Sequence, residues 1–141
     1  MRAISIMSAE PRRILFRAVA LSILAGMIHM VMAPVYFSEW LGYGAFFFGA
    51  AASQILAAFL LAAYPLSRGL LWAGIVGNSA IVALWAMTRT VGIPFFGPQA
   101  GTVLPVGVPD VAVTLIELAL IAHLVVLLRK RDQLEDRSLI E

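Results

Sequence analysis

The chain has 141 residues, of which 62% are hydrophobic and only 13% charged, and its mean hydropathy is +0.95. So few charged residues cannot cover the surface of a water-soluble protein of this length. We therefore expect an integral membrane protein with one domain spanning residues 1–141. The absence of cysteine excludes disulfides, thiolate catalysis and cysteine-ligated metal sites.

The first apolar segment covers residues 14–33. A bilayer core of about 30 Å needs about 20 apolar residues as a helix, so this segment is long enough to span it. Pro34 is expected to end the helix. The preceding basic residues also allow a cleaved signal peptide, but the apolar run exceeds the usual length of about 7–15 residues. The candidate cleavage site near Ala33 would also place Pro34 next to the bond.

Residues 43–64 and 70–87 form the second and third predicted spans, and short connections make consecutive helices antiparallel neighbours. Small residues recur at every fourth position, a pattern that lets helix backbones approach closely in a membrane. Three such stripes predict three helix contacts: Ala18, Ser22 and Gly26; Gly49, Ser53 and Ala57; and Gly69, Ala73 and Gly77.

A long stretch rich in glycine and proline, residues 89–110, follows the third span. Long loops without secondary structure are unusual in compact domains and are more often functional, so we interpret this one as a lid. Most of the aromatic residues near it are expected to form an interfacial belt, including Trp40, Tyr43, Trp85, Phe95 and Phe96. The fourth span covers residues 111–128, with Asp110 predicted as its N-cap.

The basic residues predict the orientation. Nine of the ten Lys and Arg residues fall on one side of a four-span chain: Arg2, Arg12, Arg13, Arg17, Arg68, Arg129, Lys130, Arg131 and Arg137. Only Arg89 falls on the other side. The positive-inside rule then places both tails, residues 1–13 and 129–141, in the cytoplasm of a bacterium, with the protein in the inner (plasma) membrane. The pI of about 9.5 therefore reflects topology, and no nucleic-acid partner is expected.

Polar residues within the spans predict a site, because ionisable groups there are costly and face the bundle interior or a partner. The candidate outer polar pocket consists of His29, Glu39, Gln54, Asn78, Arg89, Asp110 and Glu117. A purely structural alternative remains, in which Glu117 simply pairs with Arg89 or with His29. A divalent metal or a haem is possible, with His29 and Glu117 as the candidate ligands. His123 should lie about 10 Å deeper than His29, which disfavours a haem held by both.

Three strings, HMVMAPVYFSEWLGYGAFFFGAAASQ, GIVGNSAIVALW and TRTVGIPFFGP, resemble a group of small four-span bacterial membrane proteins without an assigned function. The resemblance runs from His29 to Glu117. The matching residues are His29, Pro34, Glu39, Gln54, Asn78, Arg89, Thr90, Gly92, Pro94, Gly97, Pro98, Asp110 and Glu117. It implies the four-helix fold and the polar constellation. This chain carries Val35, Tyr36, Thr102 and Leu104 where acidic or histidine residues are expected.

The sequence leaves three functions open. The first is a small accessory or binding subunit in the lipid bilayer, within a larger electron-transfer or photosynthetic complex or a homo-oligomer. The second is a haem- or metal-binding membrane oxidoreductase using His29 and Glu117. The third is an oligomeric transporter of protons or a small solute. We favour the first, because the motifs of nucleotide binding and common hydrolases are absent from the sequence.

Overall fold

The computed structural model describes residues 9–138, which fold into four helices and no strand. These are α2 (Ala9–Glu39), α3 (Leu41–Ala63), α4 (Arg68–Thr90) and α5 (Val108–Ser138). Each is long and apolar enough to cross a membrane, so the prediction of an all-helical fold with four candidate membrane spans is confirmed. The outermost parts of the predicted tails, residues 1–8 and 139–141, lie outside the described residues.

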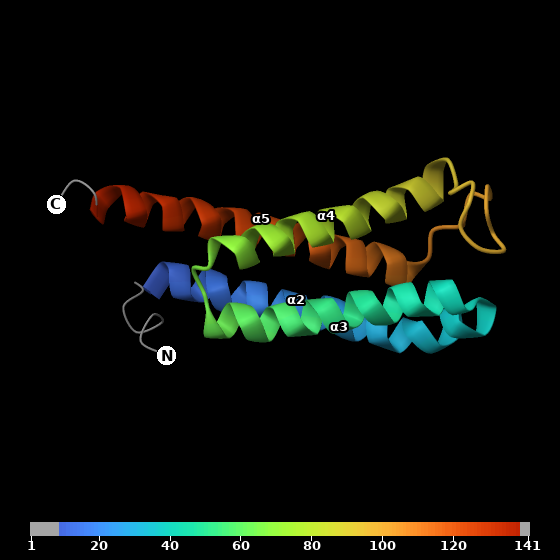
Figure 1. Cartoon of the computed structure of the whole chain (residues 1–141), viewed down its shortest axis with the longest axis horizontal. Coiled ribbons are helices and arrows are strands. Elements are labelled where there is room, and N and C mark those ends of the chain that lie inside the picture. The colour runs from blue at the N-terminus through green and yellow to red at the C-terminus, as the bar shows by residue number, and fades with distance from the viewer. Residues whose placement is uncertain (1–8, 139–141) are drawn as a thin grey trace.

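Figure 1 shows the chain turning back at each connection, so that the described chain begins and ends at one end of the bundle. We call this the terminal end, and the opposite end, which carries the long loop of residues 91–107, the loop end. α2 packs extensively on α3 and also on α5, while α4 packs on α5 and touches α3 only sparsely. This uneven packing leaves space between α3 and α4.

The expectation that Pro34 ends the first helix is wrong. α2 continues through Pro34 to Glu39, and the chain reverses at the single extended residue Trp40. Proline removes one backbone donor, but the following turn is held by packing on α3. The rings of Tyr36 and Phe47 stack with centroids 3.9 Å apart. Phe37 lies over Gly44, where a Cβ would come within 2.1 Å of its ring.

The prediction that Asp110 is the N-cap of the fourth helix is also wrong. α5 begins at Val108, so Asp110 lies inside its first turn. Its Oδ2 accepts a hydrogen bond from the N–H of Gly107 at 3.0 Å. The carboxylate thus reaches back to pair an N–H that the start of a helix leaves free. At its other end α5 extends beyond residue 128, and Arg131 donates to the carbonyl of Leu66 in the α3–α4 connection.

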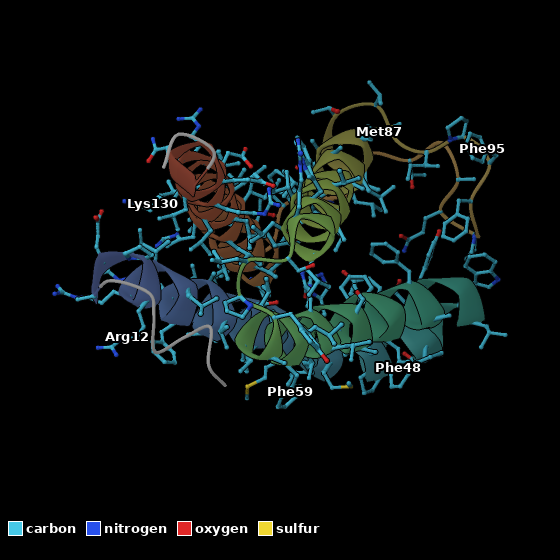
Figure 2. All side chains as sticks on the ribbon, turned by 60° about the vertical axis from the view of Figure 1, so that its left-hand side comes forward. Arg12, Phe48, Phe59, Met87, Phe95 and Lys130 are labelled. Atoms are coloured by element: carbon cyan, nitrogen blue, oxygen red, sulfur yellow. The ribbon has the colours of Figure 1, made fainter. Side chains whose placement is uncertain are left out.

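The apolar core lies toward the terminal end of the bundle. It is made of fully buried leucines from all four helices: Leu15, Leu61, Leu71, Leu120, Leu124 and Leu127. Other large apolar side chains point outward, as Phe48 and Phe59 do in Figure 2, which suits helices surrounded by lipid.

Of the three predicted stripes of small residues, only the first lies in a helix contact. Gly26 faces α3 so closely that a Cβ would lie 2.8 Å from Ile55. By contrast, a Cβ on Gly49, Gly69 or Gly77 would meet nothing within 4 Å. The second and third stripes were therefore wrongly assigned to close contacts, because α4 turns a different glycine, Gly74, toward α5.

Candidate functional site

Each of the four helices contributes one buried polar side chain to a common cluster near the middle of the bundle. We call His29 of α2, Gln54 of α3, Asn78 of α4 and Glu117 of α5 the central polar cluster. All four are at least 94% buried. Gln54 is the connecting residue: its Nε2 donates to Glu117 Oε1 at 2.8 Å and to Asn78 Oδ1 at 3.0 Å. The cluster therefore ties α3, α4 and α5 together through a single amide.

His29 faces Glu117 from the other side. Its Nδ1 lies 3.0 Å from the carbonyl oxygen of Ala25, one turn earlier in α2. A histidine that donates from Nδ1 presents Nε2 as an acceptor, and this atom lies 3.9 Å from Glu117 Oε1. The ring also contacts Phe47, with the two centroids 5.5 Å apart. His29 is thus held by its own helix and turned toward the carboxyl group.

Arg89 and Asp110 form a separate ion pair at the two ends of the long loop. Arg89 Nη2 lies 2.8 Å from Asp110 Oδ2, and the two side chains are only 9% and 16% exposed. Arg89 also donates from Nη1 to the hydroxyl of Thr88. Two partners were expected for Glu117. His29 lies beside it, whereas Arg89 pairs with Asp110 instead. Glu39 lies apart from both groups, exposed and 3.4 Å from the amide of Gln99.

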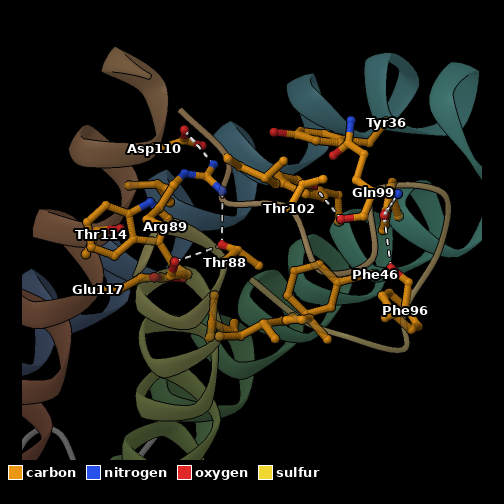
Figure 3. Close-up of a pocket in the computed structure, with 18 residues that line it drawn as sticks. Tyr36, Phe46, Thr88, Arg89, Phe96, Gln99, Thr102, Asp110, Thr114 and Glu117 are labelled. Carbon is orange, nitrogen blue, oxygen red and sulfur yellow. Dashed lines mark hydrogen bonds and ion pairs between the residues drawn. The ribbon is translucent and has the colours of Figure 1, made fainter. Parts of the chain in front are cut away.

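A cavity of about 120 Å³ lies between the central polar cluster and the loop (Figure 3). The ion pair and Glu117 line it together with residues of α2, α3 and the loop. Tyr43 attaches the loop to α3, because its hydroxyl donates to the carbonyl of Phe96 and accepts from the N–H of Gln99. Phe96 also packs edge-on against Trp40. The loop therefore lies over the cavity.

Three side chains in the cavity wall carry a buried polar atom without a hydrogen-bond partner among the described residues. These atoms are Trp85 Nε1, Arg89 Nε and Thr114 Oγ1. A fourth, Gln54 Oε1, belongs to the central polar cluster. Buried polar groups are almost always paired in native proteins, so a concentration of unpaired atoms around one cavity calls for an explanation.

Sequence reasoning missed several residues that line this cavity, among them Trp85, Tyr43 and Gln99. The two aromatic residues had been assigned to an interfacial belt, and only their position beside polar residues could have indicated otherwise. Thr114 was recognisable, because it falls between Asp110 and Glu117 at helical spacing. His123 bonds back to the carbonyl of Ala119 on its own helix.

Within residues 9–138 no three His, Cys, Asp or Glu side chains come close enough together to hold a metal ion. His29 and Glu117 offer two neighbouring donor groups.

No protein-family model, curated protein or solved structure matches the chain.

Proposed function

We propose that the chain is a small membrane-embedded binding subunit and that its loop-end cavity takes a planar group carrying carbonyl-type oxygens. The three unpaired polar atoms in the cavity wall carry this proposal. Indole and guanidinium N–H groups act only as donors, and a buried donor without a partner costs about 1–3 kcal/mol. An acceptor oxygen of a ligand placed in the cavity supplies the missing partner.

The shape and the lining of the cavity support a ring as the bound group. Six of its lining residues are aromatic: Tyr36, Tyr43, Phe46, Phe47, Trp85 and Phe96. Aromatic faces stack on planar groups, and an apolar cavity of about 150 Å³ is known to hold a single benzene ring. The volume of about 120 Å³ is of that order. A quinone-type ring, flat and bearing two carbonyl oxygens, combines both requirements.

The proposal includes a location and an orientation. The four apolar helices would cross the bacterial plasma membrane in alternating directions, with both termini in the cytoplasm. The nine-to-one distribution of basic residues supports this orientation. The loop end, with the cavity and the Arg89–Asp110 pair, would then face the outside. A ligand would enter from that side or from the outer leaflet.

The proposal also gives the chain a partner in the membrane, either another subunit or a second copy. Support comes from the low burial of α4. Only 11% of its apolar 18-residue stretch is buried, against 33% of the corresponding stretches in α2 and α5. α4 thus leaves most of its surface to lipid or to a neighbouring span. An electron-transfer complex would suit a subunit that holds a quinone-type ring.

A second candidate function is the binding of a divalent metal or a haem by His29 and Glu117. The specific support is the orientation of His29. Its Nδ1 faces a backbone carbonyl, one of the usual partners of the second ring nitrogen in metal-binding histidines, and its Nε2 faces the carboxyl group of Glu117. With two donor groups from the described residues, the rest of the coordination shell would have to come from water or from a partner.

A substitution at Trp85 tests the cavity directly. Trp85→Phe removes the unpaired N–H and keeps an aromatic ring, and Trp72→Phe on the exposed face of the same helix is the matched control. The probe is a tail-free 1,4-benzoquinone, which suits a chain without reactive cysteine. Binding in mild detergent is measured by calorimetry, so the result does not depend on tryptophan fluorescence.

We expect Trp85→Phe to weaken quinone binding about 2- to 10-fold, the equivalent of one net hydrogen bond. The same substitution should leave the melting temperature of the ligand-free protein unchanged or higher, because an unpaired donor is gone. Trp72→Phe should change neither quantity. Absence of saturable binding to the wild type, or equal affinity for Trp85→Phe, would refute the proposal. Metal analysis and an absorption spectrum of the same preparation test the second candidate.

A further inference from the structure

A second cavity, a groove of about 540 Å³, lies between α3 and α4. Its walls are mostly apolar and include small residues that were expected to form helix contacts: Gly49, Ser53 and Ala57 on α3, and Ala73 and Gly77 on α4. On α4 it extends from Leu70 to Ile81, which is about 16 Å along the helix axis at about 1.5 Å per residue. The small side chains keep this groove open.

The groove adjoins the loop-end cavity. Phe46 and Ile81 line both spaces, so the two spaces lie next to each other at these side chains. Gln54 and Asn78 line the groove close to this junction. Gln54 is 97% buried, and its Oε1 has no hydrogen-bond partner among the described residues, while its Nε2 bonds Glu117 in the neighbouring cavity. The two adjoining spaces thus combine a polar, aromatic part toward the loop end with a long apolar part toward the terminal end.

We infer that the groove holds the long apolar chain of the ligand whose ring occupies the loop-end cavity. The ligand is therefore a single-chain amphiphile: a flat head with acceptor oxygens and one hydrocarbon tail, the chemistry of a membrane quinone. This inference rests on the proposed function for the head and adds the tail. It also accounts for stripes of glycine and alanine on two helices that make little contact with each other.

The position of the groove favours a hydrocarbon chain over a helix from another protein, because the groove adjoins the cavity proposed for the ring. A chain that enters from the polar cavity also needs no polar group along its length, which agrees with the walls below Asn78.

The test compares ligands that share one head and differ in the tail. The probes are the tail-free benzoquinone, the same ring with a straight ten-carbon chain, and the same ring with an isoprenoid chain. Each is titrated into wild type, Gly77→Leu and Gly69→Leu in identical micelles. Gly77→Leu puts a side chain into the groove, whereas Gly69→Leu adds it to the same stripe outside the groove. Partition of a tail into micelles is equal for all three proteins, so it cancels in the comparison.

In wild type and Gly69→Leu we expect the tailed quinones to bind about three- to tenfold more tightly than in Gly77→Leu. The gain is modest because lipid is as apolar as the groove, so that only packing contributes. The tail-free quinone should bind all three proteins equally. The chain type with the larger gain identifies the tail. Ala57→Leu, which fills the groove from α3, replaces Gly77→Leu if that variant does not fold.

Equal affinity of the tailed quinones for wild type and for the groove variant Gly77→Leu would overturn the inference while leaving the head cavity intact. Loss of dimers in Gly77→Leu without any loss of tailed binding would also overturn it and assign the groove to a second copy. If the tail-free ring fails to bind wild type, the proposed head site fails instead. The tail groove would then stand only if tailed quinones still bind and lose affinity in Gly77→Leu.

Discussion

Arg89 and Asp110 close the long loop at its base. They lie 21 residues apart in sequence, yet Arg89 Nη2 is 2.8 Å from Asp110 Oδ2, and both side chains are largely buried. Arg89 lies in the last turn of α4 and Asp110 in the first turn of α5. Each charge also suits the dipole of its own helix end, which favours cations at C-termini and anions at N-termini. The pair therefore joins two helices where the loop leaves and returns.

A double-mutant cycle on Arg89→Ala and Asp110→Ala should show coupling of about 0.5–3 kcal/mol in the free energy of unfolding in detergent. Removing either residue alone leaves a partly buried charge without its partner. Arg89→Ala combined with Glu117→Gln should instead be additive, because these side chains belong to different groups. Strong coupling between Arg89 and Glu117, with none between Arg89 and Asp110, would contradict the observed pairing.

Gln54→Leu should lower the free energy of unfolding by about 1–3 kcal/mol, because it leaves Glu117 and Asn78 without their buried donor. Ser53→Ala is the neighbouring control, since Ser53 bonds only to its own helix, and should stay within about 0.5 kcal/mol. Thermal unfolding in the same detergent measures both. Equal stability of the two variants would mean that the Gln54 amide does not hold the cluster together.

Gly26→Leu should destabilise the bundle by about 1–3 kcal/mol through overpacking, because the new side chain meets Ile55 and the backbone of Ala51. Gly69→Leu should be tolerated, because the position is open. The melting temperatures of the two variants, relative to wild type, test this difference. A larger loss in Gly69→Leu would show that α4 makes a close contact at the stripe that the structure leaves uncovered.

Gly92 and Gly101 both have left-handed backbone conformations, with φ of 72° and 77°, but only Gly92 is crowded. An alanine at either position costs about 1–2 kcal/mol in conformation. At Gly92 its Cβ would also lie 2.8 Å from the carbonyl oxygen of Thr102. We therefore expect Gly92→Ala to speed proteolysis of the loop more than Gly101→Ala does. The reverse order would place the tight backbone contact elsewhere.

The proposed orientation is tested by single cysteines in this cysteine-free chain. Ala100→Cys lies in the exposed loop, and Ser67→Cys lies in the connection at the opposite end. An impermeant maleimide should label Ala100→Cys in intact cells and Ser67→Cys only after the membrane is permeabilised. Labelling in the opposite pattern would show that the protein crosses the membrane in the opposite orientation.

The apolar segments alone were enough to predict four membrane helices, because hydropathy is a local property that adds up along the chain. The list of polar residues in the spans also follows from the sequence alone, since each polar residue is recognisable within its own apolar segment. Helix ends were predicted less well. α2 continues past Pro34 because Tyr36 and Phe37 pack on α3, and such packing depends on residues far away in sequence.

Which polar residues meet was decided by the tertiary structure. Sequence spacing puts Asp110 and Glu117 on one stripe of α5, but it cannot say how α4 is turned toward that stripe. The tilt of α4 brings Arg89 to Asp110 and leaves Glu117 to Gln54 and His29. The same tilt holds α4 against α5 and away from α3, which turns two predicted contact stripes into a groove. Helix rotation and tilt depend on packing against all neighbours at once, so they arise only in the folded bundle.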